Sequence, residues 1–272
     1  MAFKDLIVHQ TDGAGSKRSL EVAMALALDN DAHLTGVYVL NYPAVPTFVQ
    51  AEVPPELIQQ GYETIRKAAA ECREAFEASC QREGVRGEFR VMEGDPVEAM
   101  ALCARYSDLV IAAQPDPDHP AVQDRVPEGL VMASGRPLLA VPYAGKLGKI
   151  GQRVMVAWNG SREATRAIHD AMPFLEKAES VVVFGVDPES DDHIAGADLA
   201  LHLSRHGVNA EPRHVVAPDL EVADALLSTV SDLNIDLLVM GAYGHSRLRE
   251  FVLGGATRQV FRSMTCPVLL SH

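Results

Sequence analysis

The sequence has few cysteines and no long apolar run. Its 272 residues include four cysteines, which show no CxxC spacing and no disulfide framework. Scattered cysteines of this kind are typical of a reducing compartment. The N-terminus has only a short apolar stretch without a cleavage-site pattern, and no apolar run approaches the roughly 18 residues of a membrane-spanning helix. We therefore expect a soluble, cytoplasmic protein.

Basic residues are also fewer than acidic ones. Twenty-four lysines and arginines stand against 37 aspartates and glutamates, a net charge of −13. Such a surface repels nucleic acid and anionic lipid, so we expect neither nucleic acid nor a membrane as a partner. The balance reverses locally in residues 240–267, which contain Arg247, Arg249, Arg258, Arg262 and only Glu250. A cationic patch suits an anionic ligand, although each arginine taken singly fits a solvated helix face equally well.

Apolar runs and helical patterns alternate along the whole chain. The runs predict strands at 6–8, 34–40, 87–92, 108–113, 137–141, 154–158, 180–186, 211–216, 236–240 and 268–270. Helical patterns lie between them, the longest over 54–83, and Ser16 is the expected N-cap of a helix over 16–29. Strands alternating with helices predict an α/β fold with largely parallel sheets.

The order of elements occurs twice, and short sequence matches support a duplication. Asp108-Leu-Val-Ile-Ala-Ala matches Asp236-Leu-Leu-Val-Met-Gly, and Thr11-Asp12-Gly13 matches Trp158-Asn159-Gly160. A glycine- and lysine-containing linker lies over 143–151. We therefore predict two tandem domains, 1–142 and 152–272, each an open, largely parallel five-stranded sheet flanked by helices. Ligands of such sheets bind at the carboxyl ends of the strands, where the strand order reverses.

A glycine-rich segment follows the predicted strand 236–240. Its pattern is Gly241-x2-Gly244-x9-Gly254-Gly255, before a helical pattern and the strand 268–270. It is neither a Walker A loop nor a compact GxGxxG turn. Strand, glycine loop and helix are the parts of a site that holds phosphate on backbone N–H groups. The plainer interpretation, glycines that only make turns, stays open.

The segment 236–270 closely resembles the ATP-binding signature of the universal stress protein family. The resemblance extends to Val156-Ala157-Trp158-Asn159-Gly160-Ser161 and to Glu93-Gly94-Asp95-Pro96, and covers nearly the whole chain as two copies. It implies a Rossmann-like, adenine-nucleotide α-hydrolase-like fold. It also implies binding of ATP or a related adenine nucleotide, with Mg²⁺ as an accompanying ion, by a sensor or regulator in stress responses.

The resemblance also assigns roles by position. Val186 would contact adenine through its backbone, Gly241 would lie near the ribose, and Gly244, Gly254, Gly255 and Ala256 would offer N–H groups to the phosphates. Asn159 stands where nucleotide-binding members have aspartate, and Gly255 where many have a hydroxyl side chain that Thr257 would partly replace. The candidate binding residues are Ala157, Asn159, Val186, Met240, Gly241, Gly244, His245, Gly254, Gly255, Ala256 and Thr257.

The corresponding segment of the first half lacks these features. Ala113 replaces the first glycine, and Asp116 and Asp118 fill a proline-rich loop where carboxylates would repel phosphate. We expect a degenerate site there and a structural role for this half. Copies in this family usually pair through their last strands, so the resemblance implies a fused dimer whose two domains pair within one chain, with further homodimerisation left open.

Other functions remain in view. A nucleotide-independent interaction protein of the same fold is the main alternative, and a slow ATPase ranks third because no general base or catalytic residue can be assigned. His202 and His206 have a spacing compatible with a metal, but no acidic or cysteine partner lies nearby, so no metal site is expected. Trp158 is expected to be a buried residue at a strand end, with base stacking as the other option.

Overall fold

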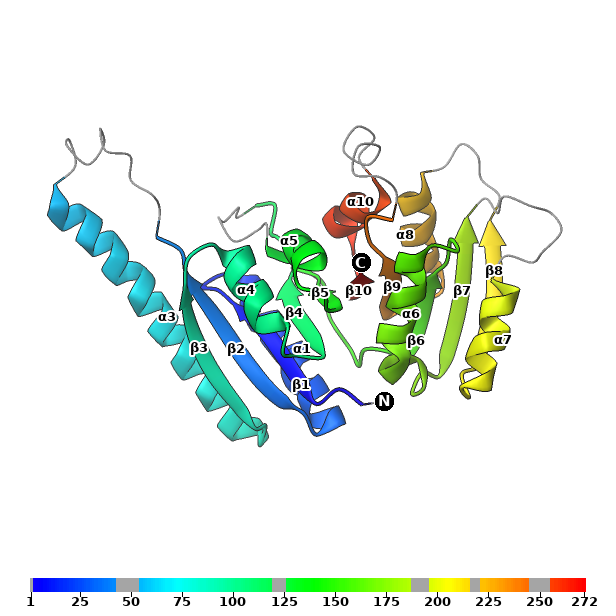
Figure 1. The fold of residues 1–272 in the computed structure, drawn as a ribbon, viewed down its shortest axis with the longest axis horizontal. Helices are drawn as coiled ribbons and strands as arrows, with labels where there is room; N and C mark the ends of the chain where they lie inside the picture. Colours follow the sequence, from blue (N-terminus) through cyan, green and yellow to red (C-terminus); the bar gives the residue numbers. More distant parts are fainter. Residues whose placement is uncertain (1, 43–53, 119–125, 187–195, 216–220, 245–254) are drawn as a thin grey trace. The chain divides into compact units, whose positions relative to one another are not determined.

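The computed structural model describes residues 2–42, 54–118, 126–186, 196–215, 221–244 and 255–272. The chain divides into two compact units, Phe3–Ser134 and Gly135–His272 together with the start of the chain. Each unit is an α/β structure whose helices flank a mostly parallel sheet (Figure 1), so the predicted fold class is confirmed. None of the helices in the described ranges is long and apolar enough to cross a bilayer.

The described residues of the unit Phe3–Ser134 form four parallel strands in the order β3-β2-β1-β4. The strands are β1 (Asp5–Gln10), β2 (His33–Leu40), β3 (Gly87–Glu93) and β4 (Leu109–Ala113). Its helices are α1 (Ala14–Asn30), α3 (Pro55–Glu83), α4 (Pro96–Ala104) and α5 (Val126–Ala133). In Figure 1, α3 runs beside β2 and β3.

In the unit Gly135–His272, the part that the structure describes has six strands in the order β5-β10-β9-β6-β7-β8. They are β5 (Leu138–Val141), β6 (Arg153–Ala157), β7 (Ser180–Val186), β8 (Ala210–Val215), β9 (Leu237–Gly241) and β10 (Val268–Ser271). Its helices are α6 (Arg162–Leu175), α7 (Ala197–Arg205), α8 (Val222–Asp232) and α10 (Ala256–Ser263). All neighbouring strands are parallel except β5, which pairs antiparallel with β10.

The central strands owe their continuous apolar sequences to burial on both faces. Leu109–Ala112 of β4 and Leu237–Val239 of β9 are completely inaccessible to solvent. A parallel strand covered by helices on both sides needs apolar residues at every position, not only at alternate ones. The outer strands β3 and β8 are mostly exposed or half-buried, and their sequences are correspondingly polar.

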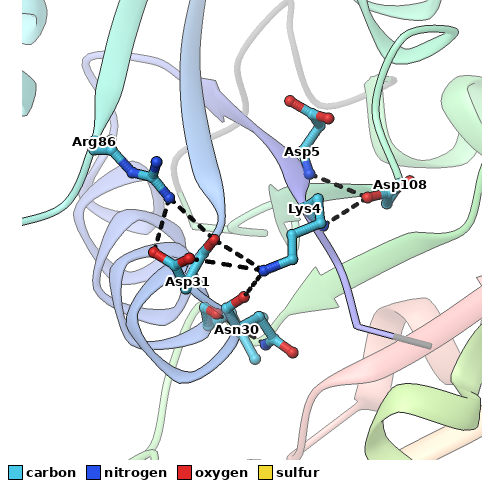
Figure 2. A network of polar contacts seen from close by, with 7 residues as sticks. Lys4, Asp5, Asn30, Asp31, Arg86 and Asp108 are labelled. Carbon is cyan, nitrogen blue, oxygen red and sulfur yellow. Dashed lines mark hydrogen bonds and ion pairs between the residues drawn. The ribbon is translucent and has the colours of Figure 1, made fainter.

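An aspartate fixes the start of the central strand in each unit. The Asp108 carboxylate accepts hydrogen bonds from the backbone N–H groups of Lys4 (2.7 Å) and Asp5 (3.0 Å), at the amino end of β1 (Figure 2). Asp236 does the same for β6: it accepts from the N–H groups of Gly151 (2.7 Å), Gln152 (2.9 Å) and Arg153 (2.9 Å). The two aspartates are the matched residues of the predicted duplication, so the repeat extends to a specific interaction.

A second set of contacts at the amino end of β1 involves the end of α1. The Lys4 Nζ atom donates to the carbonyl oxygens of Asn30 (2.9 Å) and Asp31 (3.3 Å), and Arg86 donates to the Asp31 carboxylate at 2.7 Å (Figure 2). Positive charge at the C-terminus of a helix compensates the carbonyl groups that have no partner within the helix.

Two details differ from the sequence-based expectations. The helix α1 begins at Ala14, with Gly13 at the N-cap position, so the assignment of Ser16 as N-cap was wrong. Ser16 is buried, and its Oγ accepts the N–H of Thr11 instead. The compact units divide at Ser134, because β5 pairs with β10; the division into copies at 1–142 and 152–272 stays a prediction.

Candidate functional site

The predicted site lies where the strand order reverses in the unit Gly135–His272. β6 is followed in sequence by β7 on one side, and β9 lies on its other side. At the carboxyl end of β6, Ala157 is in register with Phe184 of β7 and with Met240 of β9. Loops leaving two such strands diverge to opposite faces of the sheet, which leaves a crevice suited to a ligand.

Gly241 is required by the approach of α6 to the end of β9. A Cβ at this position would lie 2.4 Å from the backbone nitrogen of Ala164 and 2.9 Å from the Cβ of Glu163. These atoms belong to the packed first turn of α6, so moving them away from a new Cβ would cost packing energy. The glycine therefore brings the first turn of α6 against the strand that begins the glycine-rich segment.

The described start of the glycine-rich segment is held from two sides. The Tyr243 N–H donates to the Oγ1 of Thr257 at 3.4 Å, and Thr257, in the first turn of α10, is only 3% exposed. The Nδ1 of His272 lies 3.0 Å from the carbonyl oxygen of Ala242. Tyr243 has a φ of 56°, in the left-handed region. The hydroxyl of Thr257 thus connects the loop after β9 to the helix that ends it.

The turn after β6 is organised by its own polar side chains. The Asn159 Oδ1 accepts the N–H of Ser161 at 3.1 Å, and the Ser161 Oγ accepts the N–H of Ala164 at 3.2 Å as the N-cap of α6. Gly160 between them has a φ of 72° and open space around it. Asn159 itself is exposed at the strand end. Its amide oxygen therefore already accepts a hydrogen bond that stabilises a tight turn.

Glu163 is a buried charge at this site that the sequence analysis missed. It is 4% exposed, and its Oε1 lies 2.6 Å from the Nε of the largely exposed Arg162. Burial raises its pKa, but hydrogen bonds from Arg162 and from the backbone, with the charges of Arg162 and His272, outweigh burial and leave the pKa below its ordinary value. Its other oxygen, Oε2, faces the loop: a Cβ on Gly244 would lie 2.9 Å from it. Glu163 therefore remains a carboxylate beside the glycine-rich segment.

Comparison with known proteins agrees with this geometry. The profile of the Universal stress protein family matches residues 151–272. This part of the chain is a universal stress protein domain. It contains the strand ends, the first turn of α6 and the described parts of the glycine-rich segment.

Two individual relatives extend the comparison. The universal stress protein Slr1230 of Synechocystis sp. is 36% identical over 83 residues, which are 30% of this chain and 27% of that protein. The crystal structure of a universal stress protein from Archaeoglobus fulgidus DSM 4304 is 16% identical and has a TM-score of 0.77, covering 98% of this chain and 95% of that one. A protein of unknown function from Pseudomonas aeruginosa PAO1, 14% identical, covers 99% and 92% with a TM-score of 0.59. At these identities the structural matches establish the fold of the whole chain.

Several candidate residues lie around the first turn of α6 and the start of α10 in the universal stress protein domain. Gly255 is the N-cap of α10 and Ala256 its first residue, both half-buried. Val186 is the last residue of β7 and is also half-buried. His245 and Gly254 lie outside the described residues, as do Arg247 and Arg249. The structure thus describes both ends of the glycine-rich segment, and the roles of its members stay predictions.

The first-half counterpart of the universal stress protein domain makes the same strand–helix contact with the residue sizes exchanged. A Cβ on Gly15, in the first turn of α1, would lie 2.9 Å from the Cβ of Ala113 at the end of β4. In the second half the glycine is on the strand, at Gly241, and the helix contributes Glu163, whose Cβ would lie 2.9 Å from a Cβ on Gly241. The Asp116 carboxylate accepts the N–H of Asp118 at 2.9 Å. In this half the loop after the fourth strand is thus shaped by a carboxylate.

Two other features of the universal stress protein domain lie away from the strand ends. The rings of His202 and His206 have centroids 4.9 Å apart, and His169 lies 5.9 Å from His202. Within the described ranges, however, no group of three metal-ligating side chains is placed to hold an ion. A cavity of about 240 Å³ is formed by the linker and the amino ends of β6 and β9, with Lys146, Lys149, Arg153 and Asp236 in its lining. It lies at the opposite end of the strands from the predicted site.

Trp158 is less buried than predicted, whereas three of the four cysteines are buried. Trp158 is half-buried immediately after β6. All four cysteines are free, and Cys103 and Cys266 are buried. Burial, with a contribution from the charge of Asp236, raises the pKa of Cys266 to about 12, although backbone hydrogen bonds oppose the shift. Such a thiol is not a nucleophile at neutral pH.

Proposed function

We propose that this chain is a cytoplasmic stress-response protein that binds ATP or a related adenine nucleotide in residues 152–272. It would act as a sensor or regulator in stress responses, the role that the resemblance to the family implies. The nucleotide would lie across the carboxyl ends of β6, β7 and β9, with Mg²⁺ as an accompanying ion. The degenerate first half would serve as a structural partner, and β5 with β10 would supply the pairing between the two copies.

The observation that carries the proposal is the contact of Gly241 with the first turn of α6. With no Cβ at residue 241, the backbone after β9 approaches α6 closely and turns towards α10, whose Thr257 holds it. Backbone N–H groups near helix starts are ready-made partners for phosphate oxygens. The family match of residues 151–272 supports the same conclusion independently.

Substitution of Gly244 tests the assignment. In Gly244→Asp, a new side chain would start 2.9 Å from Oε2 of Glu163 and place a second carboxylate beside the first. We expect ATP affinity, measured by isothermal titration calorimetry, to fall at least about tenfold, which corresponds to 1.4 kcal/mol. Gly148→Ala, an open position in the linker, is the matched control and should bind as the parent does. Unchanged affinity in Gly244→Asp would remove Gly244 from the site.

A nucleotide-independent interaction protein is the second candidate. It is favoured by Asn159, whose amide oxygen caps the turn at Ser161 and which carries no charge for a ribose or a metal. Mass spectrometry of the purified chain under native conditions separates the two candidates. A co-purified adenine nucleotide supports the first, whereas a chain that neither carries nor binds one supports the second.

A further inference from the structure

The first turn of α6 already contains an anion. Glu163 is 4% exposed and lies on the buried face of α6, one turn before Ala167. Its carboxylate lies at the amino end of α6, where the partial positive charge of the helix stabilises a negative group. A phosphate group would also be stabilised by the partial positive charge at the amino end of α6. The chain therefore carries a fixed negative charge where the proposed function places a phosphate.

The charge of Glu163 is directed at the glycine-rich segment. Oε1 is held by Arg162, while Oε2 is the atom that a Cβ on Gly244 would meet. The side chain of Arg162 is 87% exposed, but that of Glu163 is only 5% exposed. Water and salt screen the exposed guanidinium more than the buried carboxylate, so the pair presents net negative potential to a ligand at Gly244.

This charge is a feature of the second half alone. The helices α1 and α6 begin at Ala14 and Arg162, which places Gly15 opposite Glu163. A Cβ on Gly15 would lie 2.9 Å from the Cβ of Ala113, as a Cβ on Gly241 would from that of Glu163, but glycine has no side chain and no charge. The fold therefore does not need a carboxylate at this position. A buried charge that the fold does not need is a candidate for function.

We propose that Glu163 sets the ligand class of the site: it makes the domain prefer adenine ligands with few phosphate charges over the free triphosphate. This rests on the proposed function and narrows it. Each added phosphate brings charge towards a carboxylate that has little solvent to screen it. Adenosine or a monophosphate meets this repulsion least. A triphosphate meets it most unless a cation neutralises it.

The test compares adenosine, AMP, ADP and ATP by calorimetry in a chelating buffer, with the full chain and with Glu163→Gln. The parent should bind more weakly with each added phosphate. Glu163→Gln should strengthen ATP binding by at least about tenfold, equal to 1.4 kcal/mol, and change adenosine binding less than about threefold. Glu179→Gln is the matched control, since it removes an equal charge from an exposed residue at the amino end of β7. It should leave all four affinities unchanged.

A second variant, at an exposed residue, is expected to change ATP affinity in the opposite direction. Arg162→Gln removes the compensating charge and should weaken ATP binding while leaving adenosine unchanged, which keeps the proposal testable if Glu163→Gln folds poorly. The proposal is overturned if Glu163→Gln alters all four affinities equally or not at all. It is also overturned if Glu163→Gln weakens ATP binding in Mg²⁺, because the carboxylate would then act as a metal ligand. Failure of every adenine compound to bind the parent and both variants would instead overturn the proposed function, and this inference with it.

Discussion

The contact between the fourth strand and the first helix contains one glycine in each half, on opposite sides. Gly241 on β9 faces the Ala164 nitrogen and the Glu163 Cβ on α6, and Gly15 on α1 faces Ala113 on β4. The close approach of helix and strand therefore needs one small residue, but not at a particular position. Ala113 stands where the second half has Gly241, and Gly15 allows the helix to approach the strand as closely.

Gly241→Ala should destabilise the protein. Its Cβ would lie 2.4 Å from the Ala164 nitrogen, so α6 or β9 must move. We expect the free energy of unfolding to fall by about 1–3 kcal/mol, the usual cost of overpacking a core. Gly148→Ala, with nothing within 4 Å, should change it by less than about 0.5 kcal/mol. Urea denaturation measures both, and equal stability of the two variants would contradict the described packing.

Cys266 should be almost inert in the folded protein. Its pKa is raised from 9.0 to about 12, so the thiol stays protonated as the pH rises through the range in which an ordinary cysteine ionises. At pH 8 its thiolate population is about a thousandfold smaller than that of an unshifted thiol. Labelling with a thiol reagent, located by peptide mass spectrometry, should therefore mark Cys266 only after denaturation. Rapid labelling in the native protein would show that the residue is accessible and ionised.

Among the elements, β6 has its position fixed by the residue that precedes β9. Asp236 accepts three consecutive backbone N–H groups as the linker enters β6, and Asp108 accepts two at the entry of β1. A carboxylate can satisfy several donors at once, and hydrogen bonds to a charged acceptor are stronger than neutral ones. These contacts hold the central strand of each unit in register with its neighbour.

Removing the Asp236 carboxylate should cost more stability than removing that of Asp108. Asp236→Ala leaves three N–H groups without their acceptor, and we expect a loss of about 2–3 kcal/mol. Asp108→Ala, which affects two N–H groups at a more exposed position, should lose less. Denaturant titrations of both variants give the comparison. A greater loss in Asp108→Ala would mean that the linker is not held by Asp236.

At this scale the sequence predicts most of what the structure contains. The helix predicted over 54–83 corresponds to α3 (Pro55–Glu83), and the strand 180–186 to β7 (Ser180–Val186), because long periodic or continuous apolar patterns determine element type directly. The start of α1 was misplaced, since Ser16 has the composition of a cap but its hydroxyl bonds back to Thr11.

The charged member of the site could not be predicted in the same way. Glu163 lies one turn before Ala167 on the apolar side of the helical pattern, but this periodicity does not reveal its contact with Gly244, 81 residues later in the chain. Only the packing of α6 on β9, through Gly241, shows that this carboxylate is buried beside Gly244. The glycines were recognisable because their spacing is local in sequence.

The whole molecule is organised as two α/β units with matching order of elements but different strand ends. In the second unit, the ends of β6 and β9 combine a close glycine contact, a threonine that holds the loop and a buried carboxylate. In the first, Ala113 and the aspartates of the following loop take the corresponding places. The proposed duplication has therefore kept the scaffold in both units, and we propose that it has kept a nucleotide site in one.

The stoichiometry of adenine ligand binding to the full chain is the most direct test of the claim that one nucleotide site lies in residues 152–272. Calorimetric titration with adenosine and with ATP should give one site per chain, and Gly244→Asp in the second half should weaken it. Ala113→Gly, which restores the first glycine of the other half without removing the aspartates, should add no second site. Two sites per chain, or one site unaffected by Gly244→Asp, would contradict the assignment of the nucleotide to residues 152–272.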